Sequence, residues 1–298
     1  MEFNFDLENP LSGTDEKALQ LSKRLFLGSA HSDEPAMLFA AESEHMCSLA
    51  IALNQLSTRS HALSVIVQAQ FSNNLDPALA YLAANYIDRF LAKSQIPDDK
   101  PWIARLLAIS CLCLASKMKN IGFSPADVQR EEGFIFDART IRRMELVVLG
   151  ALEWRMRSIT PFSFLRFFIS YFPLTNPIII QSLKTHASQI LFKFQSDVKS
   201  LEFKPSVTAA AALLAAAREL FPADFPSFRS ALLCCEYLNK ETLAECCTVM
   251  DSYDSTTVID AASNGCDSDY SALTPVTVLD RHRAGLESDK TAGSASNG

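Results

Sequence analysis

The segment Pro101–Lys117 reads PWIARLLAISCLCLASK, and its apolar residues fall on every side of a helix instead of on one face. A helix without a polar face is covered by other elements all round, so we expect this segment to be the centre of a helical bundle. A second run of this kind, Val207–Ala217 (VTAAAALLAAA), follows Lys204-Pro205-Ser206, in which Ser206 is a candidate N-cap. The two runs predict two bundles of roughly 100 residues each, as in an internal duplication.

The segments around these two runs also have helical signals. Asp76-Pro77 supplies an N-cap followed by proline at the first helical position of a segment that reaches Leu91. Asp137 opens another segment, in which apolar residues recur at helical spacing: Ile141, Met144, Val148 and Leu152. The chain has only 9 Gly, with none between Gly28 and Gly122. This pattern predicts an all-α protein.

The pattern divides the chain into four parts. Residues 1–42 are expected to be loosely ordered, residues 43–157 and 158–253 to form the two helical repeats, and residues 254–298 to form a disordered tail. From residue 251 onward the chain has eight acidic and three basic residues and many Ser and Thr, too little apolar area to order itself. Thr274-Pro275 in this tail is a candidate phosphosite for a proline-directed kinase, and an ordinary turn explains it equally well.

Composition excludes several classes of protein. The net charge of −7 argues against a broad basic face that binds nucleic acid. The acidic N-terminus does not resemble a signal peptide, and no uncharged apolar stretch is long enough to span a membrane, so we expect a cytosolic or nuclear protein. The eight Cys include two vicinal pairs and no CxxC, which favours free thiols over a metal site. We expect no cofactor and no catalytic centre, because no motif for either is present.

Two charged residues lie on apolar sides of their predicted helices. Glu145 falls between Ile141 and Leu152, and Lys117 ends the central segment on the side of Leu106 and Cys113. Buried charges are rare without a partner, so both could stand at the rim of an apolar groove and bind a partner's backbone. The spacing also fits a lysine at a helix end and a glutamate at the edge of a solvated face.

Arg59 and Asp88 form a second pair of interest. Asp88 follows Ile87 in a helix that is apolar over most of its surface, and Arg59 precedes the apolar residues Ala62 and Leu63. The simplest interpretation is a partly buried salt bridge that fixes how two helices pack.

Five stretches of the chain resemble known cyclins. Ala80–Leu91 (AYLAANYIDRFL), Leu106–Lys117 (LLAISCLCLASK) and Met144–Leu149 (MELVVL) resemble the cyclin box in this order and at this spacing. Leu152–Phe168 and Phe203–Leu213 resemble the D-type cyclins of plants in particular. The resemblance covers about residues 43–253 and is strongest to a short, divergent subgroup that includes a cyclin linked to formative root divisions.

The resemblance implies tandem cyclin boxes, each with five helices, the first of which binds a cyclin-dependent serine/threonine kinase. It implies kinase-binding roles for Lys117, Glu145 and Met118, and an internal salt bridge between Arg59 and Asp88. The implied mechanism is positional: the cyclin presses the kinase's C-helix inward, so that its Glu pairs with the strand Lys. The chain itself would not be an enzyme. It would act in the nucleus, and also in the cytoplasm, to promote the G1/S transition.

The chain departs from the family at a substrate-docking patch. Many cyclins frame this hydrophobic patch with Met, Leu and Trp. By alignment on Arg59, these positions are Thr58, Ala62 and Val65 here. The loss of large apolar side chains argues against substrate docking through this patch.

The chain also lacks the LxCxE motif that D-type cyclins carry near the N-terminus for retinoblastoma-type proteins. A formal match occurs at Leu232–Glu236 (LLCCE). That motif binds as an extended peptide, whereas Phe228, Leu232 and Cys235 share one helical face and predict folded core. We do not expect this segment to bind a retinoblastoma-like protein.

Two other functions are compatible with a cyclin fold. One is a transcription module of the TFIIB type, which would need basic residues clustered in the second repeat. The other is a helical scaffold without kinase activation. Binding to DNA would favour the first, and failure to bind any cyclin-dependent kinase would favour the second.

Overall fold

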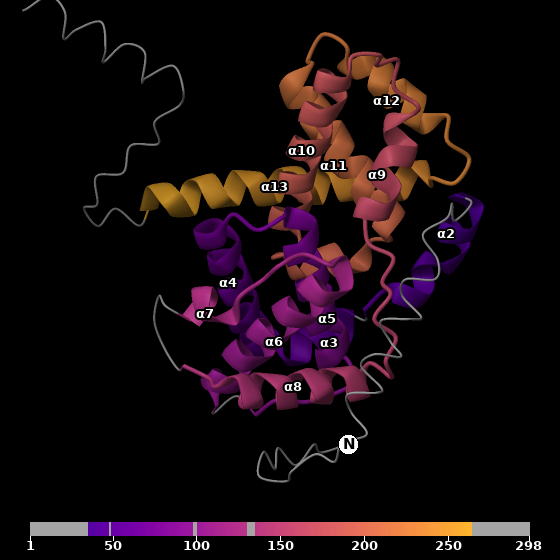
Figure 1. Cartoon of the computed structure of the whole chain (residues 1–298). Helices are drawn as coiled ribbons and strands as arrows, with labels where there is room; N and C mark the ends of the chain where they lie inside the picture. Colours follow the sequence, from indigo (N-terminus) through magenta and orange to yellow (C-terminus); the bar gives the residue numbers. More distant parts are fainter. Residues whose placement is uncertain (1–34, 48, 98–99, 130–134, 264–298) are drawn as a thin grey trace, which may run out of the picture. The chain divides into compact units, whose positions relative to one another are not determined.

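The computed structural model describes residues 35–47, 49–97, 100–129 and 135–263, and within them it is helical without a strand. Two sets of five helices follow one another (Figure 1), which confirms the predicted tandem repeats. The first set is α4 (Leu56–Asn73), α5 (Pro77–Leu91), α6 (Pro101–Lys119), α7 (Pro125–Gln129) and α8 (Ala138–Ala151). The second is α9 (Phe162–Ile169), α10 (Pro177–Phe194), α11 (Pro205–Leu220), α12 (Phe225–Leu233) and α13 (Lys240–Ser263).

Shorter elements accompany the two repeats. They are α2 (Pro35–Ala41), η1 (Glu42–His45), α3 (Leu49–Asn54) and η2 (Val198–Glu202). Residues Met1–Ser255 form one unit and Thr256–Gly298 a second, of which the structure describes only the end of α13. The contacts below all lie within the first unit.

The central helices are α6 and α11, as predicted. In α6, the side chains from Ile103 to Ser116 are buried except Arg105, and the helix packs against α4, α5 and α8. Helix α11 is buried from Pro205 to Ala217 except for Ala215, and packs against α9, α10 and α12. Within the described residues, α6 is long and apolar enough to cross a membrane, but it is mostly buried in the fold, as expected of a core helix.

Helix starts follow the sequence at two positions and depart from it at a third. Asp76 and Asp137 cap α5 and α8, accepting hydrogen bonds from the backbone N–H of Ala78 (3.0 Å) and Thr140 (2.6 Å). The prediction that Ser206 caps α11 is wrong, because α11 begins at Pro205 and Ser206 lies inside its first turn.

The carboxylate of Glu42 caps α11 instead. Glu42 is buried and accepts hydrogen bonds from the backbone N–H and the hydroxyl of Ser206, both at 2.9 Å. Burial raises the pKa of Glu42 above its ordinary value, and the two Ser206 donors oppose that shift. A residue that precedes the first repeat thus satisfies donors at the start of the second repeat's central helix.

Two ends of the repeats differ from the expected boundaries. Helix α2 lies within residues 1–42, which we expected to be loosely ordered, because Phe39 packs onto the second repeat: its ring lies 4.9 Å from that of Phe164 and stacks on Tyr237 at 4.5 Å. Helix α13 continues through residues 254–263, which we assigned to the tail, since extending an existing helix needs no new nucleus. Residues 1–34 and 264–298, including Thr274, lie outside the described residues.

Arg59 joins α4 to α5 and also to the second repeat. Its Nε lies 2.7 Å from Oδ1 of Asp88, and the two side chains are 2% and 1% exposed. The guanidinium also donates to the carbonyl oxygens of Gln195 (2.9 Å) and Ser196 (3.1 Å), at the end of α10. The last carbonyls of a helix lack partners within it and carry its negative dipole, so a buried cation stabilises them. Burial raises the pKa of Asp88, and the Arg59 charge opposes that shift.

We expect Arg59→Met to lower the free energy of unfolding by about 3–5 kcal/mol, because it leaves the buried Asp88 carboxylate without a cation. Urea unfolding followed by circular dichroism measures this loss. The control is Lys93→Met, which removes a cation from the exposed Lys93–Glu153 pair and should cost less than about 1 kcal/mol. Equal losses in the two variants would contradict the assignment.

Replacing Glu42 with Ala should cost about 1–2 kcal/mol of stability, as loss of a helix cap does. The neighbouring Glu44 is exposed, and Glu44→Ala should change stability by less than about 0.5 kcal/mol. Thermal and urea unfolding of the two variants compare these effects. If Glu42→Ala were as stable as Glu44→Ala, the bonds to Ser206 would contribute nothing.

Candidate functional site

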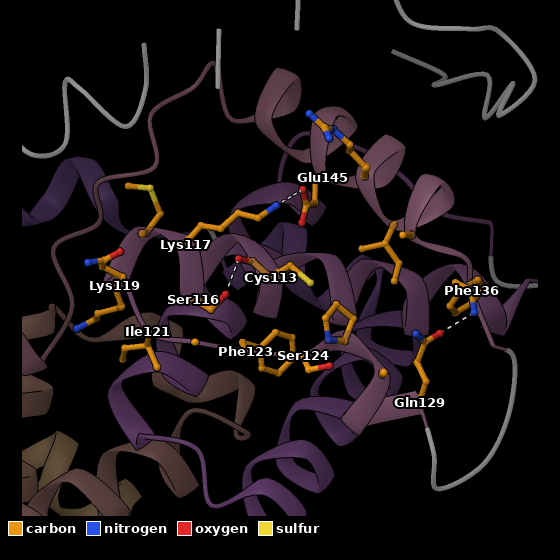
Figure 2. A pocket seen from close by; sticks show the side chains of 18 residues that line it. Cys113, Ser116, Lys117, Lys119, Ile121, Phe123, Ser124, Gln129, Phe136 and Glu145 are labelled. Carbon is orange, nitrogen blue, oxygen red and sulfur yellow. Dashed lines mark hydrogen bonds and ion pairs between the residues drawn. The ribbon is translucent and has the colours of Figure 1, made fainter. Parts of the chain in front are cut away.

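A groove of about 1010 Å³ opens on the first repeat, beside the C-terminal end of α6 (Figure 2). Its walls are the end of α6, the segment that follows it, α7 and the first half of α8. The largest apolar side chains that line it are those of Met118, Ile121, Phe123, Phe136 and Ile141. Ile121 is exposed and Met118, Phe123 and Phe136 are half-buried, so the groove presents apolar surface to solvent.

Lys117 and Glu145 meet across this groove. Lys117 Nζ lies 2.5 Å from Glu145 Oε2, and Figure 2 shows the lysine reaching from α6 toward α8. The two side chains differ in exposure: Lys117 is 38% exposed, whereas Glu145 is 5% exposed. The structure therefore brings together the two charged residues that the sequence places on apolar sides of their helices. The lysine remains accessible to solvent.

The end of α6 places Lys117 at the rim. Asn120 has a left-handed backbone (φ 56°), and the N–H of Ile121 donates to the carbonyl of Ser116 at 3.0 Å. This closing motif ends the helix and turns the chain into the groove wall, and Asn is among the few residues that tolerate it. Asn120 is not among the residues predicted above, although an Asn that follows a lysine-rich last turn is a signal for a helix end.

Gln129 holds the opposite wall of the groove. Its side chain is buried, and Oε1 accepts a hydrogen bond of 2.6 Å from the backbone N–H of Phe136. The bond keeps the end of α7 close to the segment that leads into α8 (Figure 2). The sequence carries no pattern that pairs these two positions.

The charged residues that line the groove are three cations and one carboxylate: Lys117, Lys119, Arg142 and Glu145. Cys113 lies at the floor, where burial, reinforced by the Glu145 carboxylate, raises the pKa of its thiol to about 12. That thiol is therefore neutral and unreactive at physiological pH. Among the residues that line the groove, no nucleophile is paired with a base as catalysis would require.

The three positions of the substrate-docking patch are buried in the first repeat. Ala62 and Val65 belong to its core, and Thr58 is buried beside them on α4. The three side chains are therefore smaller than the Met, Leu and Trp of other cyclins and lie largely below the surface of α4.

The segment that formally matches LxCxE, Leu232–Glu236, begins at the C-terminal end of α12 and is folded. Leu232 and Cys235 are buried in the core of the second repeat, with Phe228 on the same face. Cys234 and Glu236 are exposed, but the backbone there is helix and turn, so an extended peptide is not available.

Comparison with known families matches both repeats. The model described as "Cyclin, N-terminal domain" matches residues 34–157, and "Cyclin, C-terminal domain" matches residues 159–270. The chain belongs to the cyclin family. The viral cyclin of herpesvirus saimiri has a similar fold, with a TM-score of 0.57 at 15% identity over 66% of this chain and 84% of that one.

The curated relatives of this chain include D-type cyclins of plants, which confirms the resemblance to that group. Cyclin-D6-1 of Oryza sativa subsp. japonica is 42% identical over 311 residues, 99% of this chain and 88% of that protein. A protein named as cyclin-D6-1 in Arabidopsis thaliana is 42% identical over 297 residues, 96% of this chain and 93% of its own length. Cyclin-D1-1 of Arabidopsis thaliana is 37% identical over 207 residues, 65% of this chain and 58% of that protein.

The two partners of the groove's ion pair should contribute unequally to stability. Lys117→Met leaves the nearly buried Glu145 carboxylate without a cation and should cost about 1–3 kcal/mol. Glu145→Gln leaves a lysine that can turn to water and should cost less than about 1 kcal/mol. Urea unfolding measures both, and a larger loss in Glu145→Gln would mean that the carboxylate is not the buried partner.

Proposed function

We propose that this chain is the regulatory subunit of a cyclin-dependent serine/threonine kinase, which it binds and activates. The observation that carries the proposal is the apolar groove of the first repeat with the Lys117–Glu145 pair across it. Membership of the cyclin family supports it, since cyclins are regulatory subunits and not enzymes.

The groove suits a helical segment of a kinase with its flanking loop. Such a segment would lay apolar side chains against Met118, Ile121 and Phe123 and remove that surface from water. Lys117 can donate to its backbone carbonyls, and Glu145 can accept from its N–H groups. Because the two side chains already hold each other in place, little rotamer entropy would be lost on binding.

Activation by this subunit would be positional. A cyclin that binds beside the kinase's C-helix presses it inward, so that the helix Glu pairs with the strand Lys and the ATP site is assembled. The equilibrium of the kinase shifts only by the difference in affinity for its two states, so a stiff groove is needed. The closing motif at Asn120 and the Gln129–Phe136 bond supply that stiffness.

The proposal includes promotion of the G1/S transition, with the nucleus, and also the cytoplasm, as the place of action. The similarity of this chain to the D-type cyclins of plants supports the cell-cycle role. It does not include a retinoblastoma-like partner bound through Leu232–Glu236, since Leu232 is held in the core.

A scaffold or a transcription module of the TFIIB type is the alternative. The net charge of −7 is unfavourable for a DNA-binding module, since affinity for the phosphate backbone comes from cations. An electrophoretic shift with duplex DNA would favour the transcription module. Failure to activate any cyclin-dependent kinase, without DNA binding, would favour the scaffold.

Removal of both charges of the groove tests the kinase proposal. Lys117→Ala with Glu145→Ala leaves no orphaned charge, so helicity should be kept, while affinity for the kinase should fall about 100-fold, as at an interface hot spot. Co-purification with candidate cyclin-dependent kinases, followed by a kinase assay, measures binding and activation.

The matched control is Lys93→Ala with Glu153→Ala, which removes an exposed ion pair of the same chemistry elsewhere in the first repeat. It should bind and activate as the unchanged chain does. A Lys117/Glu145 variant that still activates the kinase would show that the site is assigned wrongly.

A further inference from the structure

A second groove on the second repeat repeats the plan of the first. It lies between α11, α12 and α13 and has a volume of about 340 Å³. Its two main walls are the central helix and the last helix of the repeat, the counterparts of α6 and α8. Helix α12 takes the place of α7 as the third wall.

The ion pair of the first groove also has a counterpart here. Arg218, near the end of α11, binds Asp251 of α13 through two hydrogen bonds, of 2.8 and 2.5 Å. In both grooves a cation near the end of the central helix meets a carboxylate of the last helix. The position one turn before the cation lines the groove in each case: Cys113 before Lys117, and Leu214 before Arg218.

The floor of the second groove is apolar and its rim is positive. Leu214, Leu243 and Met250 are buried at the floor. The charged side chains that line the groove are three cations, Arg218, Arg229 and Lys240, and the single carboxylate of Asp251. Glu241 and Glu245 also belong to α13 but are not among the lining residues.

The net positive charge of the side chains that line this groove is opposite in sign to the net charge of the whole chain, which is −7. Arg218 is matched by Asp251, whereas Arg229 and Lys240 are exposed at the rim and have no acidic counterpart among the lining residues. An acidic partner therefore gains attraction at this groove that the rest of the chain does not offer. The volume is near the lower end for binding pockets and accommodates about one large side chain.

We propose that this groove docks a helix of a partner protein that inserts one large apolar side chain and flanks it with Asp or Glu. The apolar side chain contacts Leu214, Leu243 and Met250, and the acids face Arg229 and Lys240. Helices commonly dock in this way, with a few anchors at one-turn spacing. The proposal concerns a partner other than the kinase and does not depend on kinase binding by the first repeat.

The test uses the full chain and a fluorescein-labelled synthetic peptide of about 16 residues, long enough to form a helix. The peptide carries one central Trp with Glu three and four residues to either side. Fluorescence anisotropy should show saturable binding that weakens as salt is raised, because the rim contacts are charged. Absence of saturable binding would overturn the proposal.

Two charge-reversal variants locate the peptide. Arg229→Glu with Lys240→Glu should weaken binding at least about tenfold, since each reversal turns attraction into repulsion at the rim. The control, Lys184→Glu with Lys199→Glu, makes the same charge change at exposed positions outside the groove and should stay within about twofold. If both variants bound the peptide equally weakly, the loss of affinity would come from the net charge of the chain alone, and the assignment of the site would be wrong.

Three further probes separate the occupant from its alternatives. Peptides with Ala in place of Trp, or Lys in place of Glu, should bind at least about tenfold more weakly, because the anchor and the acids each contribute. A single-stranded oligonucleotide of equal charge that bound more tightly through Arg229 and Lys240 would indicate a nucleic-acid site and overturn the protein partner. Kinase activation by the Arg229/Lys240 variant should be unchanged. The kinase assay therefore tests the proposed function, and the peptide titration tests the second groove independently.

Discussion

The arrangement of the two repeats depends on the hydrogen bonds of the Arg59 guanidinium to Asp88 and to the end of α10. A buried cation is costly unless its donors are paired, and here Asp88 accepts two hydrogen bonds from Arg59 and the end of α10 accepts two more. The pair therefore fixes α4 against α5 and α10 against both. Phe192 of α10 packs into the core of the first repeat, and the Glu42 cap joins the segment that precedes the first repeat to α11 of the second.

The two repeats share one construction, a buried central helix whose last turn carries a cation that pairs with the final helix. In the first repeat the pair stands beside the wide apolar groove that we propose as the kinase site. In the second, the bidentate Arg218–Asp251 pair stands beside a groove about a third as large. Around each groove the lining cations outnumber the lining carboxylates. The acidic chain therefore has two locally positive surfaces, which would attract acidic or polar partner segments.

Periodicity and capping chemistry predicted most of the fold. The all-round apolar runs identified α6 and α11, and Asp76 and Asp137 identified two helix starts, because these signals are local. The wheel placed Lys117 and Glu145 on apolar sides, but only the fold shows that they meet. What the sequence did not reveal depends on distant contacts: Glu42 capping α11, Phe39 stacking on Tyr237, and Gln129 holding Phe136. Ser206 has the correct residue type for a cap but lies two residues after the N-cap position, which Lys204 occupies.

Whether the repeats unfold as one cooperative unit tests the role of Arg59 most directly. Both tryptophans, Trp102 and Trp154, belong to the first repeat or its closing turn, whereas far-ultraviolet circular dichroism reports helices of both repeats. Urea unfolding followed by both signals should give coincident transitions, as expected of a single two-state unit. Loss of about half the helicity while tryptophan fluorescence stays native would show that the repeats unfold independently, and would contradict the account.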